Sequence, residues 1–149
     1  MEKEKQVDVV LVEDSLEDTE LTHYSLMNGN DHLQLQHFTN GEEALDFIFK
    51  RKTFWGQSTI DHLKLIILDL NLPTKLGGLD IVRKIKAQEN TRSIPIVVLS
   101  SSKDQKDIHG AYDLGVNSYV VKPDGFDGYL SKISSMAKYW STVNERPIK

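Results

Sequence analysis

The chain alternates five times between a short apolar run and a longer segment with a helical period. The runs are rich in β-branched residues and nearly unbroken, which predicts strands buried on both faces. The segments between them space apolar residues three or four apart, as amphipathic helices do. The predicted strands are Val7–Val12, Leu33–Phe38, Leu65–Leu68, Ile94–Leu99 and Val116–Val121. The predicted helices are Leu16–Met27, one that opens at Asn40-Gly41, Leu79 to about Gln88, Asp104–Leu114 and Phe126 to about Val143.

This order of elements limits the fold to very few topologies. Short, right-handed crossovers between successive strands predict a parallel sheet with helices on both faces. Regular (βα)5 alternation favours the flavodoxin-like doubly wound α/β fold, with five strands in the order 2-1-3-4-5. A length of 149 residues, 39% of them hydrophobic, predicts a single domain over residues 1–149 with a core of about 7–140. The connection over residues 52–62 is longer than the others.

Composition excludes several classes of function. There is no cysteine, so disulfides, thiolate metal sites and cysteine nucleophiles are absent. A net charge of -4 argues against binding to nucleic acid or to an anionic membrane. The charged segment Met1–Lys5 does not resemble a signal peptide, and no apolar run approaches the length of a membrane span. We therefore expect a cytoplasmic protein.

Polar residues stand at the carboxyl ends of four predicted strands. These residues are Glu13-Asp14, Asp69, Ser100 and Lys122-Pro123. In a parallel sheet such ends meet at one rim, where open α/β proteins bind ligands. Adjacent carboxylates repel unless a cation is shared, and hard oxygen ligands favour Mg²⁺. Asp69 could then act as a nucleophile toward phosphorus, with the Lys122 ammonium beside the phosphoryl group.

Each of these residues also has an ordinary explanation when it is taken alone. The Glu13-Asp14 pair fits a solvated turn before a helix, and Asp69 fits a loop-bracing acid. Lys122 fits an exposed lysine before a helix-starting proline, whose preceding peptide bond is either trans or, less commonly, cis. Ser100 fits a loop or helix cap. Four such coincidences at four strand ends in order are a poor explanation, so the joint arrangement favours a metal-dependent phosphoryl site.

The same residues resemble the motifs of a response-regulator receiver domain, over roughly residues 7–140. The matching stretches are Val10–Ser15, Leu68–Pro73, Pro95–Ser100 and Tyr119–Pro123. The resemblance implies that Asp69 is the phosphoacceptor and that a histidine kinase or phosphotransfer protein is the donor. It also implies a Mg²⁺ site of Glu13, Asp14, Asp69 and the backbone carbonyl of Asn71.

The resemblance assigns further roles around this site. Lys122 would pair with the phosphoryl oxygens, and the hydroxyl of Ser100 would bond to one of them. Tyr119 would change rotamer as Ser100 moves, which is a local charge event acting on a bistable element. The side chains of Asn71 and Ser102 would tune the lifetime of the phosphoryl group. One departure from the family is the loop Leu76-Gly77-Gly78, which is longer and lacks the usual aspartate.

The long connection, the Leu68–Pro73 stretch and the segment Tyr139–Val143 are similar to single-domain regulators paired with phytochromes. That similarity implies a light- or redox-sensing, bacteriophytochrome-type kinase. It also implies a homodimer through the fourth helix, fifth strand and fifth helix. The short stretch after Val121 leads us to expect a stand-alone regulator that acts through an unknown downstream protein.

Two other functions fit parts of the same pattern. The first is a small phosphatase or phosphotransferase with Asp69 as nucleophile. Such enzymes need a second acid to protonate the leaving group, and Asn71 stands two residues on, where that acid would be useful. The second is a flavodoxin-like electron carrier, which the first strand does not support because no hydroxyl-rich loop follows it. We therefore predict a phosphoacceptor domain rather than a metabolic enzyme.

Overall fold

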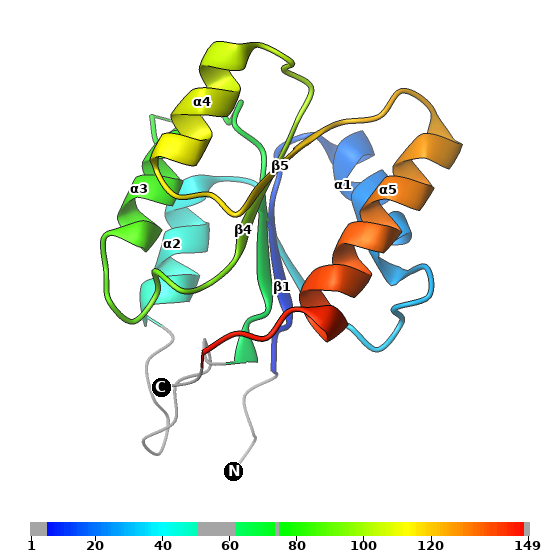
Figure 1. Cartoon of the computed structure of the whole chain (residues 1–149), viewed down its shortest axis with the longest axis horizontal. Coiled ribbons are helices and arrows are strands. Elements are labelled where there is room, and N and C mark those ends of the chain that lie inside the picture. Colours follow the sequence, from blue (N-terminus) through cyan, green and yellow to red (C-terminus); the bar gives the residue numbers. More distant parts are fainter. Residues whose placement is uncertain (1–5, 51–61, 74, 148–149) are drawn as a thin grey trace.

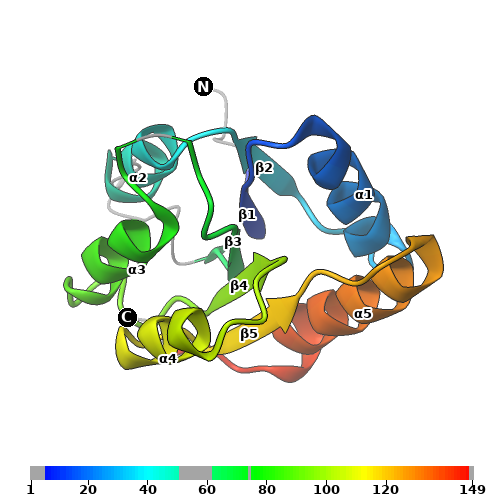
Figure 2. The same cartoon turned by 90° about the horizontal axis from the view of Figure 1, so that it is seen from above.

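The computed structural model describes residues 6–50, 62–73 and 75–147, and it shows a parallel sheet between two layers of helices (Figure 1). The sheet has five strands in the order β2-β1-β3-β4-β5, as the view from above shows (Figure 2). The strands are β1 (Val9–Val12), β2 (Leu35–Phe38), β3 (Leu65–Leu68), β4 (Ile96–Ser100) and β5 (Ser118–Val121). The helices are α1 (Leu16–Met27), α2 (Gly41–Lys50), α3 (Gly78–Lys86), α4 (Gln105–Asp113) and α5 (Phe126–Lys138). The predicted flavodoxin-like fold and strand order are confirmed.

Several strand and helix ends differ from the prediction by one or two residues. β1 begins at Val9, and just before it the Asp8 carboxylate accepts a hydrogen bond from the amide of Gln34 at 2.8 Å. β4 extends to Ser100, which pairs with Val121. After α5 the chain continues as a wider π-helical turn over Tyr139–Val143, so the helical segment ends where the sequence predicted.

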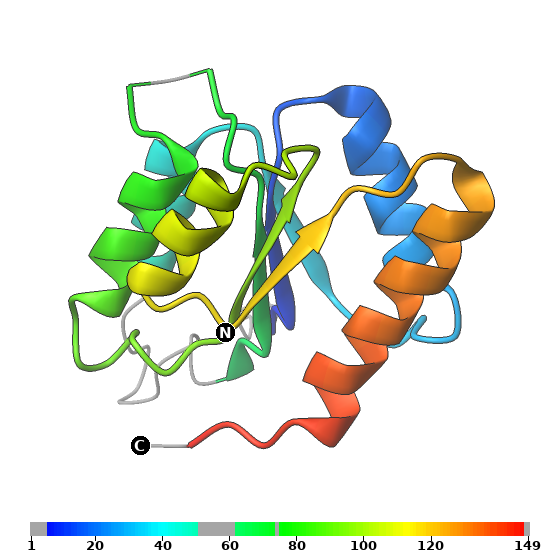
Figure 3. The ribbon, with the colours of Figure 1, turned by 45° about the horizontal axis from the view of Figure 1, so that its top comes forward.

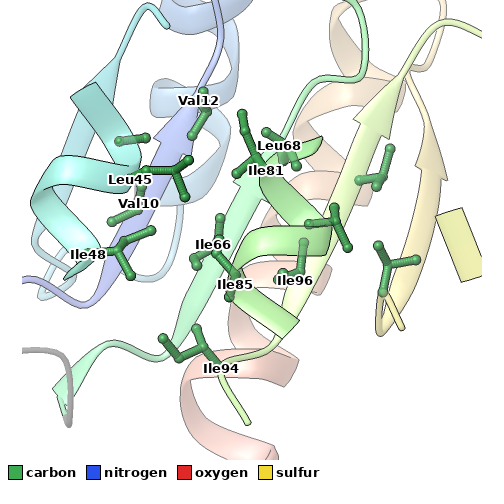
Figure 4. Packing of buried hydrophobic residues seen from close by; sticks show 14 of the residues in the cluster. Val10, Val12, Leu45, Ile48, Ile66, Leu68, Ile81, Ile85, Ile94 and Ile96 are labelled. Carbon is green, nitrogen blue, oxygen red and sulfur yellow. The ribbon is translucent and has the colours of Figure 1, made fainter. Parts of the chain in front are cut away.

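The two faces of the sheet carry separate hydrophobic cores, because side chains alternate along each buried strand. Val10, Ile66 and Ile96 point toward α2 and α3, where they meet residues such as Ile48 and Ile85 (Figure 4). Their sequence neighbours on the strands point the other way and pack against α1 and α5. The inner strands β1, β3 and β4 are therefore buried on both faces and form a rigid platform for the loops at their ends.

Some predicted features lie outside the described residues. The long connection predicted over residues 52–62 is described only at its last residue, and residue 74 of the loop after β3 is likewise not described. In the described part of the chain, no helix combines the length and hydrophobicity that a membrane crossing requires.

A half-buried lysine braces the end of the sheet where β4 and β5 begin. Lys86 Nζ, in the last turn of α3, donates to the backbone oxygens of Arg92 at 2.9 Å and Ile94 at 3.0 Å. It also lies 3.3 Å from Asn117 Oδ1, which accepts the amide of Ile96 at 2.9 Å. Burial lowers the pKa of Lys86. The amine therefore ties the end of α3 to the segments that enter β4 and β5.

We expect Lys86→Met to lower the free energy of unfolding by about 1–2 kcal/mol, because backbone oxygens lose a donor that water replaces only in part. Urea denaturation at neutral pH measures the change. Lys84→Met is the matched control, since Lys84 is an exposed lysine of the same helix. Equal midpoints for the two variants would show that Lys86 does not brace the fold.

Candidate functional site

The carboxyl ends of the parallel strands lie together at one rim of the sheet (Figure 3), and polar residues follow three of them. Glu13 follows β1, Asp69 follows β3 and Lys122 follows β5. Lys122 Nζ donates to Glu13 Oε1 at 2.7 Å and to Asp69 Oδ2 at 3.0 Å. Residues 109 and 53 positions apart in the chain are thus joined in one ion-paired cluster.

Glu13 and Asp69 of this cluster, together with the neighbouring Asp14, could hold a cation. One oxygen from each of Glu13, Asp14 and Asp69 lies within 4.8 Å of the others. Glu13 is 2% exposed and Asp69 is 7% exposed, whereas Asp14 faces solvent. Two buried acids side by side need compensating positive charge, and hard oxygen donors of this kind suit a divalent ion such as Mg²⁺. The residues present therefore fit a metal site open to solvent on the Asp14 side.

Burial and hydrogen bonding act against each other in the electrostatics of the cluster. It raises the pKa of Glu13 to about 7; hydrogen bonding to Lys122 lowers it, and the neighbouring Asp69 charge adds to the rise. Burial also disfavours the charged form of Lys122, but hydrogen bonds to Asp18, Glu13 and Asp69 outweigh that cost and raise the pKa of its ammonium. Lys122 is therefore the fixed positive charge of the site.

The backbone around Lys122 is set by the end of β5. The amide of Lys122 donates to the backbone oxygen of Ser100 at 2.8 Å, and Pro123, which has no amide hydrogen, ends the pairing there. The Lys122–Pro123 peptide bond is trans, so the cis alternative is wrong. The long lysine side chain reaches the acids from this position.

Ser100 and Tyr119 are joined through Ser102. Ser100 is fully buried, and its Oγ accepts the amide of Ser102 at 3.2 Å. The Tyr119 hydroxyl donates to the backbone oxygen of Ser102 at 2.9 Å. The Ser102 hydroxyl donates to Asp107 Oδ2 at 2.5 Å and accepts the amide of Asp104 at 3.2 Å. The loop between β4 and α4 is therefore held at both ends.

The loop after β3 shapes the surroundings of Asp69. The amide of Asn71 donates to Asp69 Oδ1 at 3.0 Å, while the Asn71 side chain is exposed. Gly78 packs so closely that a Cβ there would lie 2.6 Å from Leu70 Cα and 2.7 Å from the Asp69 backbone oxygen. α3 begins at this glycine, one residue earlier than predicted. The departure at Leu76-Gly77-Gly78 thus places glycine where the backbone requires it.

Two residues of the site were missed by the sequence analysis. Asp18 Oδ2 lies 2.7 Å from Lys122 Nζ, and His37 Nε2 lies 2.7 Å from the backbone oxygen of Glu13. Asp18 had no signal of its own, because acids are common in the first turn of a helix and its contact with Lys122 joins residues 104 positions apart. His37 had none, since its role depends on pairing between β1 and β2.

Comparison with known proteins decides the family. Residues 9–134 match the response regulator receiver domain. The chain belongs to the response regulator receiver domain family. Receiver domains are signalling domains, with aspartate phosphorylation and a bound divalent metal as general family features, and they work with a histidine kinase or phosphotransfer protein. The choice between a signalling domain and a phosphatase is thus settled in favour of the signalling domain.

Two relatives illustrate the similarity of this receiver domain to known regulators. Response regulator Rcp1 of Synechocystis is 29% identical over 132 residues, which cover 89% of this chain and 87% of Rcp1. FilR2 of Methanothrix harundinacea, a probable methanogenesis regulatory protein, is 34% identical over 103 residues, 62% of this chain and 66% of FilR2. The chain thus spans just under two thirds of FilR2.

Solved structures agree with these matches. The phosphorylated cyanobacterial phytochrome response regulator RcpA superimposes with a TM-score of 0.82 at 29% identity, over 96% of this chain and 99% of RcpA. The Mn²⁺-bound form of Rcp1 gives a TM-score of 0.80 at 28% identity, over 95% of this chain and 99% of that one. The predicted resemblance to phytochrome-associated regulators is confirmed at the level of sequence and fold.

Proposed function

We propose that this receiver domain accepts a phosphoryl group on Asp69 from a histidine kinase or phosphotransfer protein, and that it reports the event through its surface. The observation that carries the proposal is the position of the Lys122 ammonium between two buried carboxylates, those of Glu13 and Asp69. It is a fixed cation beside an acid that the fold keeps largely out of water.

Asp69 is the best placed of the three acids to act as nucleophile. Its Oδ1 accepts the amide of Asn71 and its Oδ2 accepts Lys122, so the carboxylate is oriented from both sides. Glu13 also accepts Lys122 and an amide, that of Ser15 at 3.3 Å, but it is 2% exposed against 7% for Asp69 and so is less accessible to a donor. In the transfer, an Asp69 oxygen forms a bond to phosphorus as the bond from phosphorus to the donor's leaving group breaks, giving an acyl phosphate.

The chain's other residues would stabilise that product. Glu13, Asp14, Asp69 and the backbone carbonyl of Asn71 would hold Mg²⁺, which supplies positive charge to offset the phosphoryl oxygens. Lys122 would bond to a phosphoryl oxygen, and so would the Ser100 hydroxyl after it leaves the Ser102 amide. The side chains of Asn71 and Ser102 would tune the rate of self-catalysed dephosphorylation.

Output would follow from the Ser100–Ser102–Tyr119 connection. Movement of Ser100 would shift Ser102, whose backbone oxygen accepts a hydrogen bond from the Tyr119 hydroxyl. Tyr119 would then repack on the surface formed by α4, β5 and α5. Tyr112 of α4 is 48% exposed and Tyr139, directly after α5, is also 48% exposed. Exposed aromatic side chains of this kind suit contact with a homodimer partner or a downstream protein.

The partner kinase is proposed from the relatives. RcpA is described as a phytochrome response regulator, and coverage of RcpA and Rcp1 extends over nearly their whole lengths. That coverage supports a single-domain regulator of a bacteriophytochrome-type kinase. The net charge of -4 gives no support for nucleic acid or an anionic membrane as a partner.

The test is incubation with Mg²⁺ and acetyl phosphate, followed by intact mass spectrometry. We expect one phosphoryl adduct on the natural chain and none on Asp69→Asn, because the amide is no nucleophile. Asp113→Asn, which changes an exposed acid of α4, should keep the adduct. An adduct that persists in Asp69→Asn, or no adduct on the folded natural chain, would overturn the proposal.

A further inference from the structure

We infer that Asp18 is a positioning residue that anchors the Lys122 ammonium at the site, so that phosphorylation proceeds with Lys122 already in place. The inference rests on the proposed phosphorylation of Asp69. It extends that proposal to a residue outside the set Glu13, Asp14, Asp69 and Lys122.

The Asp18 carboxylate binds the Lys122 ammonium as closely as Glu13 does. Lys122 Nζ makes three short contacts, to Glu13 and Asp18 at 2.7 Å and to Asp69 at 3.0 Å. An ammonium has three hydrogens, so these three acceptors satisfy it fully. The Lys122 side chain is 10% exposed and that of Asp18 is 33% exposed, which leaves one side of the bridge reachable by water.

Local structure explains why this carboxylate is available to Lys122. Asp18 is the third residue of α1, where an acid ordinarily reaches back to the amide of the capping residue. Here that amide, on Ser15, donates to Glu13 Oε2 at 3.3 Å instead. The Ser15 hydroxyl accepts the amide of Asp18 at 3.2 Å and so fixes its backbone. The Asp18 side chain can therefore turn toward β5.

The proposed chemistry distinguishes Asp18 from the other two acceptors. Glu13 would bind the metal, and Asp69 would bind both the metal and the phosphoryl group. The hydrogen bonds of these two acids to Lys122 would therefore weaken or change. Asp18 would bind neither the metal nor the phosphoryl group. It can therefore hold the ammonium in place while Lys122 exchanges an Asp69 oxygen for a phosphoryl oxygen. Without Asp18, Lys122 would bond more closely to Glu13 and Asp69 and would compete with the groups that have to bind there.

The test compares initial rates of adduct formation with acetyl phosphate at saturating Mg²⁺. We expect Asp18→Asn to slow phosphorylation about tenfold, equivalent to about 1.4 kcal/mol, in keeping with loss of a charged hydrogen bond. Glu17→Gln, which changes an exposed acid in the same turn, should match the natural chain. Asp18→Glu should restore part of the rate, because its carboxylate still reaches toward the ammonium.

A double-mutant cycle and a spectroscopic signal separate positioning from a general role in α1. In a Lys122→Met background, Asp18→Asn should cause no further slowing. In ¹⁵N-lysine-labelled protein, the Lys122 ammonium should give a slowly exchanging ¹H–¹⁵N signal that Asp18→Asn removes and Glu17→Gln keeps.

Two outcomes would overturn the inference: Asp18→Asn reacting at the natural rate, or slowing the reaction equally in both backgrounds. If the natural chain forms no adduct, the proposed function fails. The ammonium signal then decides alone whether Asp18 anchors Lys122.

Discussion

Lys122→Met is expected to lower the free energy of unfolding of the metal-free protein by about 3 kcal/mol, because it leaves buried carboxylates without their cation. Glu13 and Asp69 are each less than a tenth exposed, so water cannot replace the lost ammonium. Asp18 is more exposed and contributes less to the loss. Urea denaturation in the presence of a chelator measures this change.

Mg²⁺ should recover part of that stability, and it should stabilise Lys122→Met more than the natural chain. A cation that binds the folded state alone shifts the unfolding equilibrium toward it, and in the variant it also meets uncompensated charge. Lys132→Met is the control, since Lys132 is an exposed lysine of α5. A variant as stable as this control, with no added response to Mg²⁺, would contradict the account of the cluster.

Gly78→Ala is expected to lower the free energy of unfolding by about 2–3 kcal/mol, because an added methyl group meets backbone atoms rather than a flexible side chain. The nearest atoms would be Leu70 Cα at 2.6 Å and the Asp69 backbone oxygen at 2.7 Å. Relief of the clash moves the segment that carries the Asp69 carboxylate. Phosphorylation by acetyl phosphate should therefore slow along with the loss of stability.

The adjacent glycine is a close control for that experiment. A Cβ on Gly77 would come no nearer than 3.7 Å, to the Asp80 carboxylate, and its φ of -78° is accessible to alanine. Gly77→Ala should keep the natural urea midpoint and phosphorylation rate. Similar behaviour of both variants would show that close packing against Asp69 is not what requires glycine at position 78.

Most of the fold could be predicted because its signals are local. The composition of runs such as Leu65–Leu68 is enough to predict a buried strand. The alternation of strands with helices then limits the topology. The same topology predicts that Glu13, Asp69 and Lys122 converge, since each follows a strand of one parallel sheet. The order of the elements along the chain was enough to place them together.

What could not be predicted depends on contacts between distant segments. Asp18 and Lys122 are 104 residues apart, and no periodicity links a residue in the first turn of α1 to the end of β5. The close approach of Gly78 to Leu70 depends on how α3 packs after β3. In each case the deciding atoms belong to a neighbour that only the folded chain supplies.

The place of β5 at the edge of the sheet has a consequence for how a signal would spread. β5 is only half-buried along its length and pairs with β4 alone, whereas β1, β3 and β4 are buried throughout. An edge strand is hydrogen-bonded to one neighbouring strand only, so its local unfolding costs less free energy than that of a central strand. Tyr119 thus lies on a strand that can shift while the inner strands keep their protection against hydrogen exchange.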